Sequence, residues 1–187
     1  MSEMIEQAFE EANEQAEKSI DHLRKELSKL RTGKANPSML DNVYIDYYGS
    51  QSPLNQVANV SAQDSKTLTI QPWDKSIIDT IEKAIFEANL GLTPQNDGEV
   101  IRINIPPLTE ERRKDLVKQA KGFAEDTKIS LRNVRREVLD VIKEEVKDGY
   151  PEDQGKRRES EVQELLNKYG NKVDQIIEAK ESDIMTI

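Results

Sequence analysis

Apolar residues recur every three or four positions along the first thirty residues of the chain. The repeating positions are Ile5, Phe9, Ala12, Ala16, Ile20, Leu23, Leu27 and Leu30. Because an α-helix has 3.6 residues per turn, this spacing predicts a helix with one narrow apolar stripe. Gly33 is suited to end the helix, and Pro37 cannot continue it. A single helix of this kind is marginal in water, so its stripe must be buried on other elements.

The pattern changes between about residues 38 and 105 to the alternation that is typical of strands. Val43, Ile45 and Tyr47 alternate with polar residues, and short strands are also predicted at 57–60 and 67–70. A helix is predicted between Asp74 and Gly91. A last strand follows, with alternating isoleucines at 101, 103 and 105. The segment is therefore a small α+β unit, and we expect Trp73 to pack inside it.

Two further long helices follow this unit. Pro106 and Pro107 stop the last strand, and Thr109 can cap a helix that runs to Gly149. Its predicted apolar stripe comprises Leu116, Ala120, Phe123, Thr127, Ser130 or Leu131, Val134, Val138 and Val141. The final helix repeats the pattern from Val162 to Ile184.

These elements predict an elongated α+β protein with two domains. Residues 1–30 and 106–187 form a three-helix bundle, and residues 31–105 form the inserted α+β domain. Two chain segments connect the domains and are expected to act as a hinge. The predicted hinge residues are Thr32, Gly33, Asn104, Ile105, Pro106 and Pro107.

Charge is distributed unevenly along a chain whose net charge is −9. Residues 112–136 contain nine Lys or Arg residues and only three carboxylates. Helical spacing places Lys114, Lys118, Lys121, Lys128, Arg132 and Arg135 on one stripe, which Arg112, Arg113 and Arg136 would widen. We expect this stripe about 200° from the apolar stripe, with Glu125 as the only acidic residue in register with it. Exposed helix faces usually mix charges, so a face of one sign predicts phosphate binding, at a length that suits structured RNA. The alternative is an ordinary solvated face.

A second basic cluster ends near Arg31 and Lys34. Cations at the end of a helix also complement its dipole, and this simpler interpretation applies to the cluster when it is taken alone. Together with the first stripe, the cluster would extend the same surface.

Enzymatic chemistry has little support in the sequence. The chain has no Cys and a single histidine, His22, so neither a metal site nor a nucleophilic dyad is expected. Gly33 and Lys34 do not form a phosphate loop, because Ser28 and Ala35 occupy the other required positions. We expect no enzyme activity, no cofactor and no metal. The absence of Cys fits a reducing cytoplasm, and no run of 18 apolar residues predicts a membrane span.

Several stretches resemble the bacterial ribosome recycling factor family. They are residues 30–40 (LRTGKANPSML), Tyr47-Tyr48-Gly49, Leu90-Gly91-Leu92, residues 106–114 (PPLTEERRK) and residues 132–136 (RNVRR). The similarity covers essentially the whole chain in order. Family members often have Arg where this chain has Lys34, and often Ser where it has Asn36.

The resemblance implies an L-shaped molecule in which the inserted domain is a β/α/β unit. It further implies a translation factor that binds large-subunit ribosomal RNA on the post-termination ribosome. Elongation factor G and GTP would then drive separation of the subunits. Arg132, Arg135 and Arg136 are the implied RNA contacts, with Arg31 in support, and the inserted domain would meet the elongation factor. We expect a cytoplasmic monomer without a DNA or membrane partner; the alternative from the residues alone is a coiled-coil chaperone or cochaperone that acts as a dimer.

Overall fold

The chain divides into two compact units whose boundaries follow Arg31 and Thr109. A computed structural model describes residues 2–186, so residues 1 and 187 of the predicted bundle lie outside the described part. Residues 106–109 belong to the small unit and not, as predicted, to the bundle. The reason is the packing of Leu108 onto Gly33, where a Cβ atom would lie only 2.8 Å from Leu108 Cγ.

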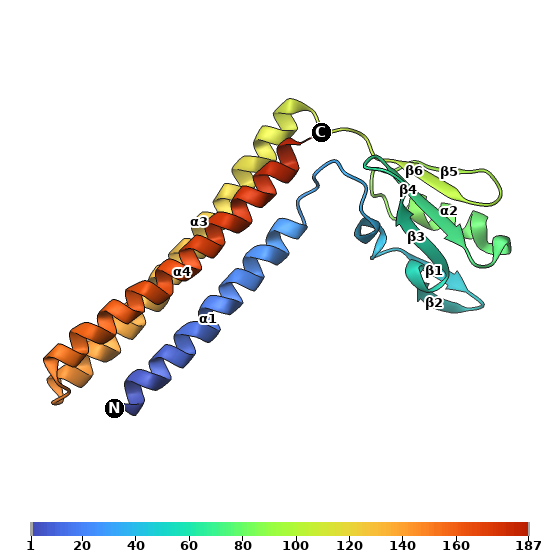
Figure 1. The fold of residues 1–187 in the computed structure, drawn as a ribbon. Helices are drawn as coiled ribbons and strands as arrows, with labels where there is room; N and C mark the ends of the chain where they lie inside the picture. Colours follow the sequence, from blue (N-terminus) through green and yellow to red (C-terminus); the bar gives the residue numbers. More distant parts are fainter. Residues whose placement is uncertain (1, 187) are drawn as a thin grey trace. The chain divides into compact units, whose positions relative to one another are not determined.

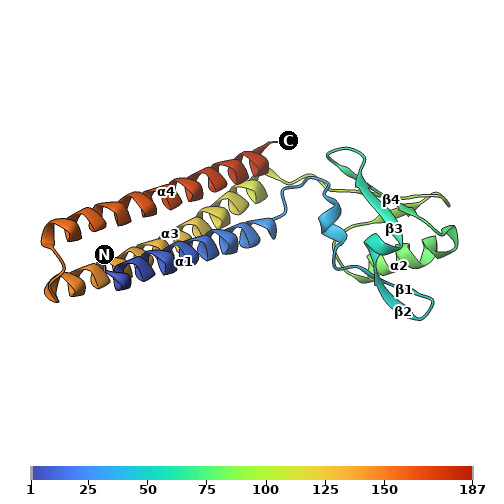
Figure 2. The same ribbon diagram turned by 60° about the horizontal axis from the view of Figure 1, so that its bottom comes forward.

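The first unit is a bundle of three long helices that lie side by side (Figures 1 and 2). They are α1 (Glu3–Ser28), α3 (Glu110–Lys147) and α4 (Glu152–Met185). The Ser2 hydroxyl caps α1 by accepting a hydrogen bond from the backbone N–H of Ile5. Gly149 lies in the turn between α3 and α4. Its φ of 108° is a backbone conformation that L-residues avoid.

The buried stripe of α3 differs in part from the predicted one. Its buried residues are Leu116, Ala120, Ala124, Thr127, Leu131, Val134, Val138 and Ile142. Ala124 and Ile142 are buried in place of the predicted Phe123 and Val141, which are only half-buried. The helix packs on both α1 and α4, so its buried face is shifted and widened relative to a single seam.

Polar contacts connect α4 to α1 across the bundle. Tyr169 is 4% exposed, and its hydroxyl lies 3.1 Å from Asn13 Oδ1 and 3.0 Å from Glu17 Oε1. Near the other end of the bundle, the Arg158 guanidinium lies 4.2 Å from the Phe9 ring centre and 2.9 Å from Glu6 Oε1. These contacts fix the register of the two helices.

The small unit contains an antiparallel four-stranded sheet in the order β3-β4-β6-β5 and a separate hairpin of β1 and β2. The strands are β1 (Tyr44–Tyr47), β2 (Ser50–Pro53), β3 (Ala58–Ala62), β4 (Thr67–Pro72), β5 (Pro94–Asn96) and β6 (Ile101–Asn104). The helices are the 3-10 turns η1 (Pro37–Leu40), η2 (Leu54–Gln56) and η3 (Lys75–Ile77) and the α-helix α2 (Ile78–Glu87). The α+β class is thereby confirmed, and β2 and β5 are strands that the sequence did not predict.

Isoleucines and leucines from the sheet and from α2 form the core of this unit. Leu68, Ile70, Ile101, Ile103 and Ile81 are fully buried. Trp73 is 68% exposed, so the prediction that it packs inside the unit was wrong. The reason is the alternation along β4: Leu68, Ile70 and Pro72 face the core, which turns the next residue to the other face.

Two of the predicted hinge residues belong to the sheet region of the small unit. Asn104 pairs with Thr67 in the β4–β6 ladder, and buried Ile105 donates its backbone N–H to the Lys66 carbonyl at 2.7 Å. They are therefore not part of a free connection. Thr32, Gly33, Pro106 and Pro107 lie outside regular helices and strands.

Candidate nucleic-acid interface

Six cations follow one flank of α3, and we call them the cationic ridge: Lys114, Lys118, Lys121, Lys128, Arg132 and Arg135. Five of the six are exposed, and Lys128 is half-buried. Most ridge residues directly follow a buried one, as Lys128 follows Thr127 and Arg132 follows Leu131. One residue corresponds to about 100° of helix rotation. The ridge therefore lies about a third of a turn from the middle of the buried stripe, and the predicted 200° was wrong.

Because of this angle, the ridge borders α4. Lys128 Nζ lies 2.8 Å from Asp174 Oδ1, and Lys121 Nζ lies 3.7 Å from Glu181 Oε1. Arg135 donates from Nη1 to Gln163 Oε1 at 2.9 Å. The ridge is thus one wall of a surface that both helices share.

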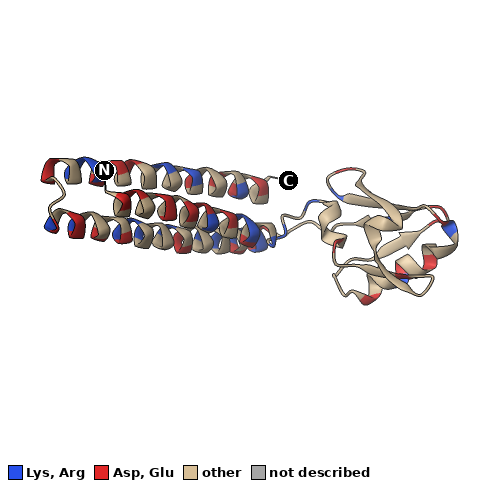
Figure 3. Ribbon diagram, turned by 90° about the horizontal axis from the view of Figure 1, so that it is seen from below, with Lys and Arg blue, Asp and Glu red and all other residues tan. Residues whose placement is uncertain are grey.

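Carboxylates accompany the ridge more closely than the sequence predicted. Besides the two acidic residues of α4, Glu110 pairs with Lys114 and Glu125 with Arg132, each at 3.4 Å. Of these carboxylates only Glu125 was predicted, in register with the ridge on α3, whereas Asp174 and Glu181 come from α4. Acidic and basic residues are interspersed along the bundle (Figure 3). Exposed ion pairs contribute only about 0–1 kcal/mol, so a phosphate can replace such a carboxylate at little cost.

The remaining predicted α3 cations differ in their surroundings. Within residues 2–186, Lys118 and Arg136 form no ion pair, and both are exposed. Arg113 is half-buried, three residues before buried Leu116, and its Nε atom is buried without a hydrogen-bond partner. It therefore faces the bundle and does not widen the ridge, contrary to the prediction. Arg112 is exposed but pairs with Asp115 at 2.7 Å.

The second predicted basic cluster is divided between the units. Arg31 is the last bundle residue before the small unit, and Lys34 belongs to the small unit. Arg31 is exposed and Lys34 is half-buried.

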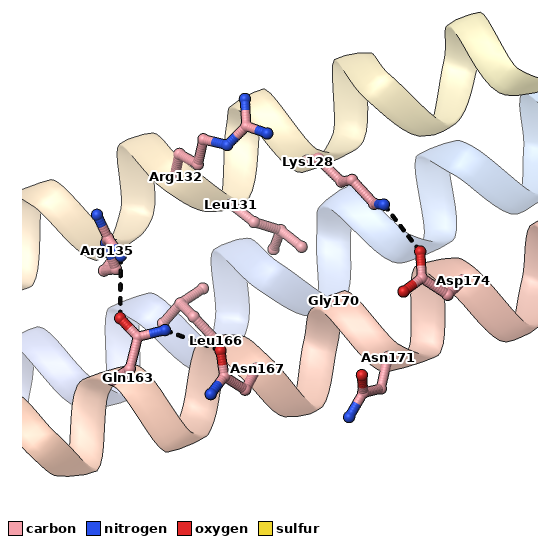
Figure 4. Close-up of a pocket in the computed structure, with 10 residues that line it drawn as sticks. All are labelled: Lys128, Leu131, Arg132, Arg135, Gln163, Leu166, Asn167, Gly170, Asn171 and Asp174. Carbon is pink, nitrogen blue, oxygen red and sulfur yellow. Dashed lines mark hydrogen bonds and ion pairs between the residues drawn. The ribbon is translucent and has the colours of Figure 1, made fainter.

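A groove between α3 and α4 lies directly beside the ridge, with a cavity volume of about 390 Å³. Its lining combines cations, amides and two leucines: Lys128, Leu131, Arg132, Arg135, Gln163, Leu166, Asn167, Gly170, Asn171 and Asp174 (Figure 4). Leu131 and Leu166 are buried and form the apolar part. This groove could not be predicted from the sequence, because it exists only where α4 packs beside α3. The amides Gln163, Asn167 and Asn171 are the residues that sequence reasoning missed.

Residues 2–186 hold no group of three or more His, Cys, Asp or Glu side chains that could bind a metal ion. His22 is exposed, at the edge of a groove between α1 and α3. No described helix has the length and apolar character needed to cross a membrane.

Comparison with known proteins gives consistent results over the whole chain. Residues 23–185 match the family model described as ribosome recycling factor. The ribosome-recycling factor of Christiangramia forsetii is 53% identical over 183 residues, 98% of each chain. That of Flavobacterium johnsoniae is 50% identical over 187 residues and covers both chains completely.

Two solved structures are similar to this chain over their full length. The solution structure of a ribosome recycling factor is 37% identical, with a TM-score of 0.78. The second is 43% identical, with a TM-score of 0.64. It comprises models for the T. thermophilus ribosome recycling factor and the E. coli elongation factor G bound to the E. coli post-termination complex.

Proposed function

The chain belongs to the ribosome recycling factor family, and from this premise we propose how it recycles ribosomes. It binds the post-termination ribosome through large-subunit ribosomal RNA and, with elongation factor G and GTP, separates the subunits. The observation that supports RNA binding is the cationic ridge, a row of six Lys and Arg on one flank of α3 in a protein with a net charge of −9. The GTP-dependent chemistry in this proposal belongs to the elongation factor.

The length of the ridge fits a nucleic-acid backbone better than a small anion. It extends over 21 residues of one helix, or about 32 Å at ~1.5 Å per residue. Lys121 and Arg132 have side chains that are 65% and 62% exposed, so both can reach phosphates. Lys118 of the ridge and the additional cation Arg136 form no ion pair within residues 2–186. By family resemblance, Arg132, Arg135 and Arg136 are the central contacts, with Arg31 in support.

The small unit is the proposed contact for elongation factor G. A related ribosome recycling factor is described together with that factor on the post-termination complex. The small unit has few cations of its own, and residues 35–105 contain nine carboxylates against four Lys or Arg, which favours a protein over RNA as its partner. Thr32, Gly33, Pro106 and Pro107 are the proposed hinge in the two connections between the units.

A coiled-coil chaperone that dimerises through its long helices has less support. The apolar stripes of α1, α3 and α4 are buried against one another within the single chain. The exposed large apolar residues of the described bundle are separated: Met4, Ile129 and Met185. A second chain therefore has no continuous seam to pack on, and we propose a monomer.

The test is co-sedimentation of the protein with ribosomes across a potassium chloride series, with and without elongation factor G and GTP. Phosphate contacts release counterions, so the affinity should fall steeply as salt rises. Arg135→Glu should weaken binding at least several-fold and reduce the salt dependence. Its unfolding free energy should change by no more than about 0.5 kcal/mol, because the site is exposed.

The matched control is Arg157→Glu, which makes the same charge change at an exposed arginine of α4. Arg157 pairs with Glu161 at 3.5 Å and lies outside the ridge. We expect this variant to bind ribosomes like the unaltered protein. Equal affinities for all three proteins would remove the ridge from the mechanism.

A further inference from the structure

The groove beside the ridge is lined by groups that suit a nucleobase. One face of α4 supplies the amides Gln163, Asn167 and Asn171, and the buried side chains of Leu131 and Leu166 supply apolar surface. Asn and Gln amides carry both a donor and an acceptor, which matches the edge of adenine. The volume of about 390 Å³ is within the usual range for a small ligand.

Hydrogen bonds that begin at the ridge orient two of these amides, Gln163 and Asn167. Arg135 donates to Gln163 Oε1, and Gln163 Nε2 donates to Asn167 Oδ1 at 2.8 Å (Figure 4). This chain of bonds occupies the acceptor of Asn167 and leaves its NH₂ group available as a donor. Within residues 2–186, Asn171 forms no hydrogen bond through its side chain, so a complete amide is also available there.

Gly170 leaves space open along the α4 side of the groove. Glycine inside a helix costs about 0.5–1 kcal/mol relative to alanine, and Gly170 lies in the middle of α4. Close packing does not explain it, because a Cβ atom at Gly170 would meet no atom within 4 Å beyond its own helix and its chain neighbours. Any larger side chain would instead project into the groove that Gly170 lines.

We propose that this groove binds one unstacked base, adenine by its hydrogen-bonding pattern, of the RNA that the ridge holds. The ridge arginines contact the phosphates on either side, the leucines pack on the base, and Asn167 and Asn171 hydrogen-bond to its edge. The proposal rests on the proposed function, because it assigns a base-reading role to a surface that otherwise recognises only phosphates.

The test compares two RNA hairpins that carry the same charge. One has a single unpaired adenosine in its stem, and the other has an abasic ribose at that position. We expect the full-length protein to bind the adenosine hairpin at least 5-fold more tightly, measured by fluorescence anisotropy at low salt. In Gly170→Leu the difference should fall below 2-fold, while affinity for the abasic hairpin and its salt dependence stay unchanged.

Gly122→Leu is the matched control. Gly122 is also a glycine inside a helix with open space around its Cβ position. It follows Lys121 by one residue, so it lies about 100° further round α3, on the side away from the groove. This variant should keep the preference for adenosine. Both leucine variants should melt at or above the temperature of the unaltered protein, which excludes misfolding as the cause.

Equal binding of the two hairpins by the unaltered protein, or binding of neither, overturns the proposal. So does a preference for adenosine that survives in Gly170→Leu. If the groove instead binds something other than a base, such as an apolar peptide side chain, the protein should bind the two hairpins with equal affinity. A failure here leaves the ribosome result for Arg135→Glu standing, whereas a ribosome affinity insensitive to that substitution contradicts the proposed function itself.

Discussion

Tyr169 shows how one side chain can connect residues that are 156 positions apart in the sequence. Its ring is buried in the bundle, and its hydroxyl bonds to Asn13 and Glu17 of α1. Burial and the hydrogen bond to the Glu17 carboxylate raise the pKa of Tyr169 from 10.0 to about 12. The same hydrogen bond lowers the pKa of Glu17. The hydrogen bond therefore contributes to both pKa shifts, and burial adds to the shift of Tyr169.

Tyr169→Phe should lower the unfolding free energy at pH 7 by about 1 kcal/mol, the usual contribution of one hydrogen bond. The pKa is higher in the folded protein, so this contribution is complete below pH 10 and is lost as pH rises towards about 12. The stability difference between the two proteins should therefore shrink between pH 7 and pH 11, as measured by urea unfolding. Tyr44→Phe, at a tyrosine that is 54% exposed, is the control. A difference that grows with pH would contradict this assignment.

The sequence predicts which residues form the ridge more reliably than it predicts on which side of α3 they lie. A row of Lys and Arg at steps of three and four needs only the helical repeat, so the members of the ridge were identified. Their direction depends on which apolar residues are buried, and Ala124 and Ile142 were not expected. Arg113 lies on the buried side for the same reason.

Helices and strands could be predicted from the sequence only where the pattern of apolar residues is strong. The three long helices were predicted closely, because each carries a long periodic stripe. Strands β2 and β5 have the sequences SQSP and PQN, which lack apolar alternation, and they are strands only because β1 and β6 pair with them. The groove between α3 and α4 could not be predicted for a similar reason, since it requires the register of two helices.

Two glycines of α4 should respond oppositely to the same substitution. At Gly155 a Cβ atom would lie 2.7 Å from Val146 Cγ2, and a β-branched side chain has little freedom to move away. Overpacking costs about 1–3 kcal/mol, against about 1 kcal/mol gained in helix propensity, so Gly155→Ala should be destabilising by about 1 kcal/mol. Gly170→Ala meets open space and should be stabilising by about 0.5–1 kcal/mol. Thermal melting of both variants checks the sign, and a stabilising Gly155→Ala would contradict the packing argument.

At the scale of the whole molecule, the chain passes twice between its two units. One passage contains Gly33, which has φ 74° and lies against Leu108 of the other. A positive φ is open to glycine and closed to proline, whose ring fixes φ near −65°. The backbone conformation of this connection therefore depends on glycine at position 33.

Gly33→Pro should separate the two proposed activities. The ridge on α3 is unchanged, so ribosome binding in the salt series should persist. Subunit separation by elongation factor G and GTP, followed by light scattering, should slow several-fold if motion through this connection is required. Gly149→Pro, at the turn between α3 and α4, is a control for backbone strain outside the connection. Loss of ribosome binding in Gly33→Pro, or unimpaired splitting, would contradict this division of roles.

The insertion of the small unit between α1 and α3 also determines the order in which a nascent chain can fold. Residues 32–109 are contiguous and can fold once they leave the exit tunnel. Helix α1 is synthesised first, but its partners on α3 and α4 arrive last, as the pairing of Asn13 with Tyr169 illustrates. Until then the apolar stripe of α1 has nothing to pack on. Translation that stops early therefore yields a chain in which the small unit is folded and α1 is uncovered. Such a chain is a substrate for chaperones and proteases.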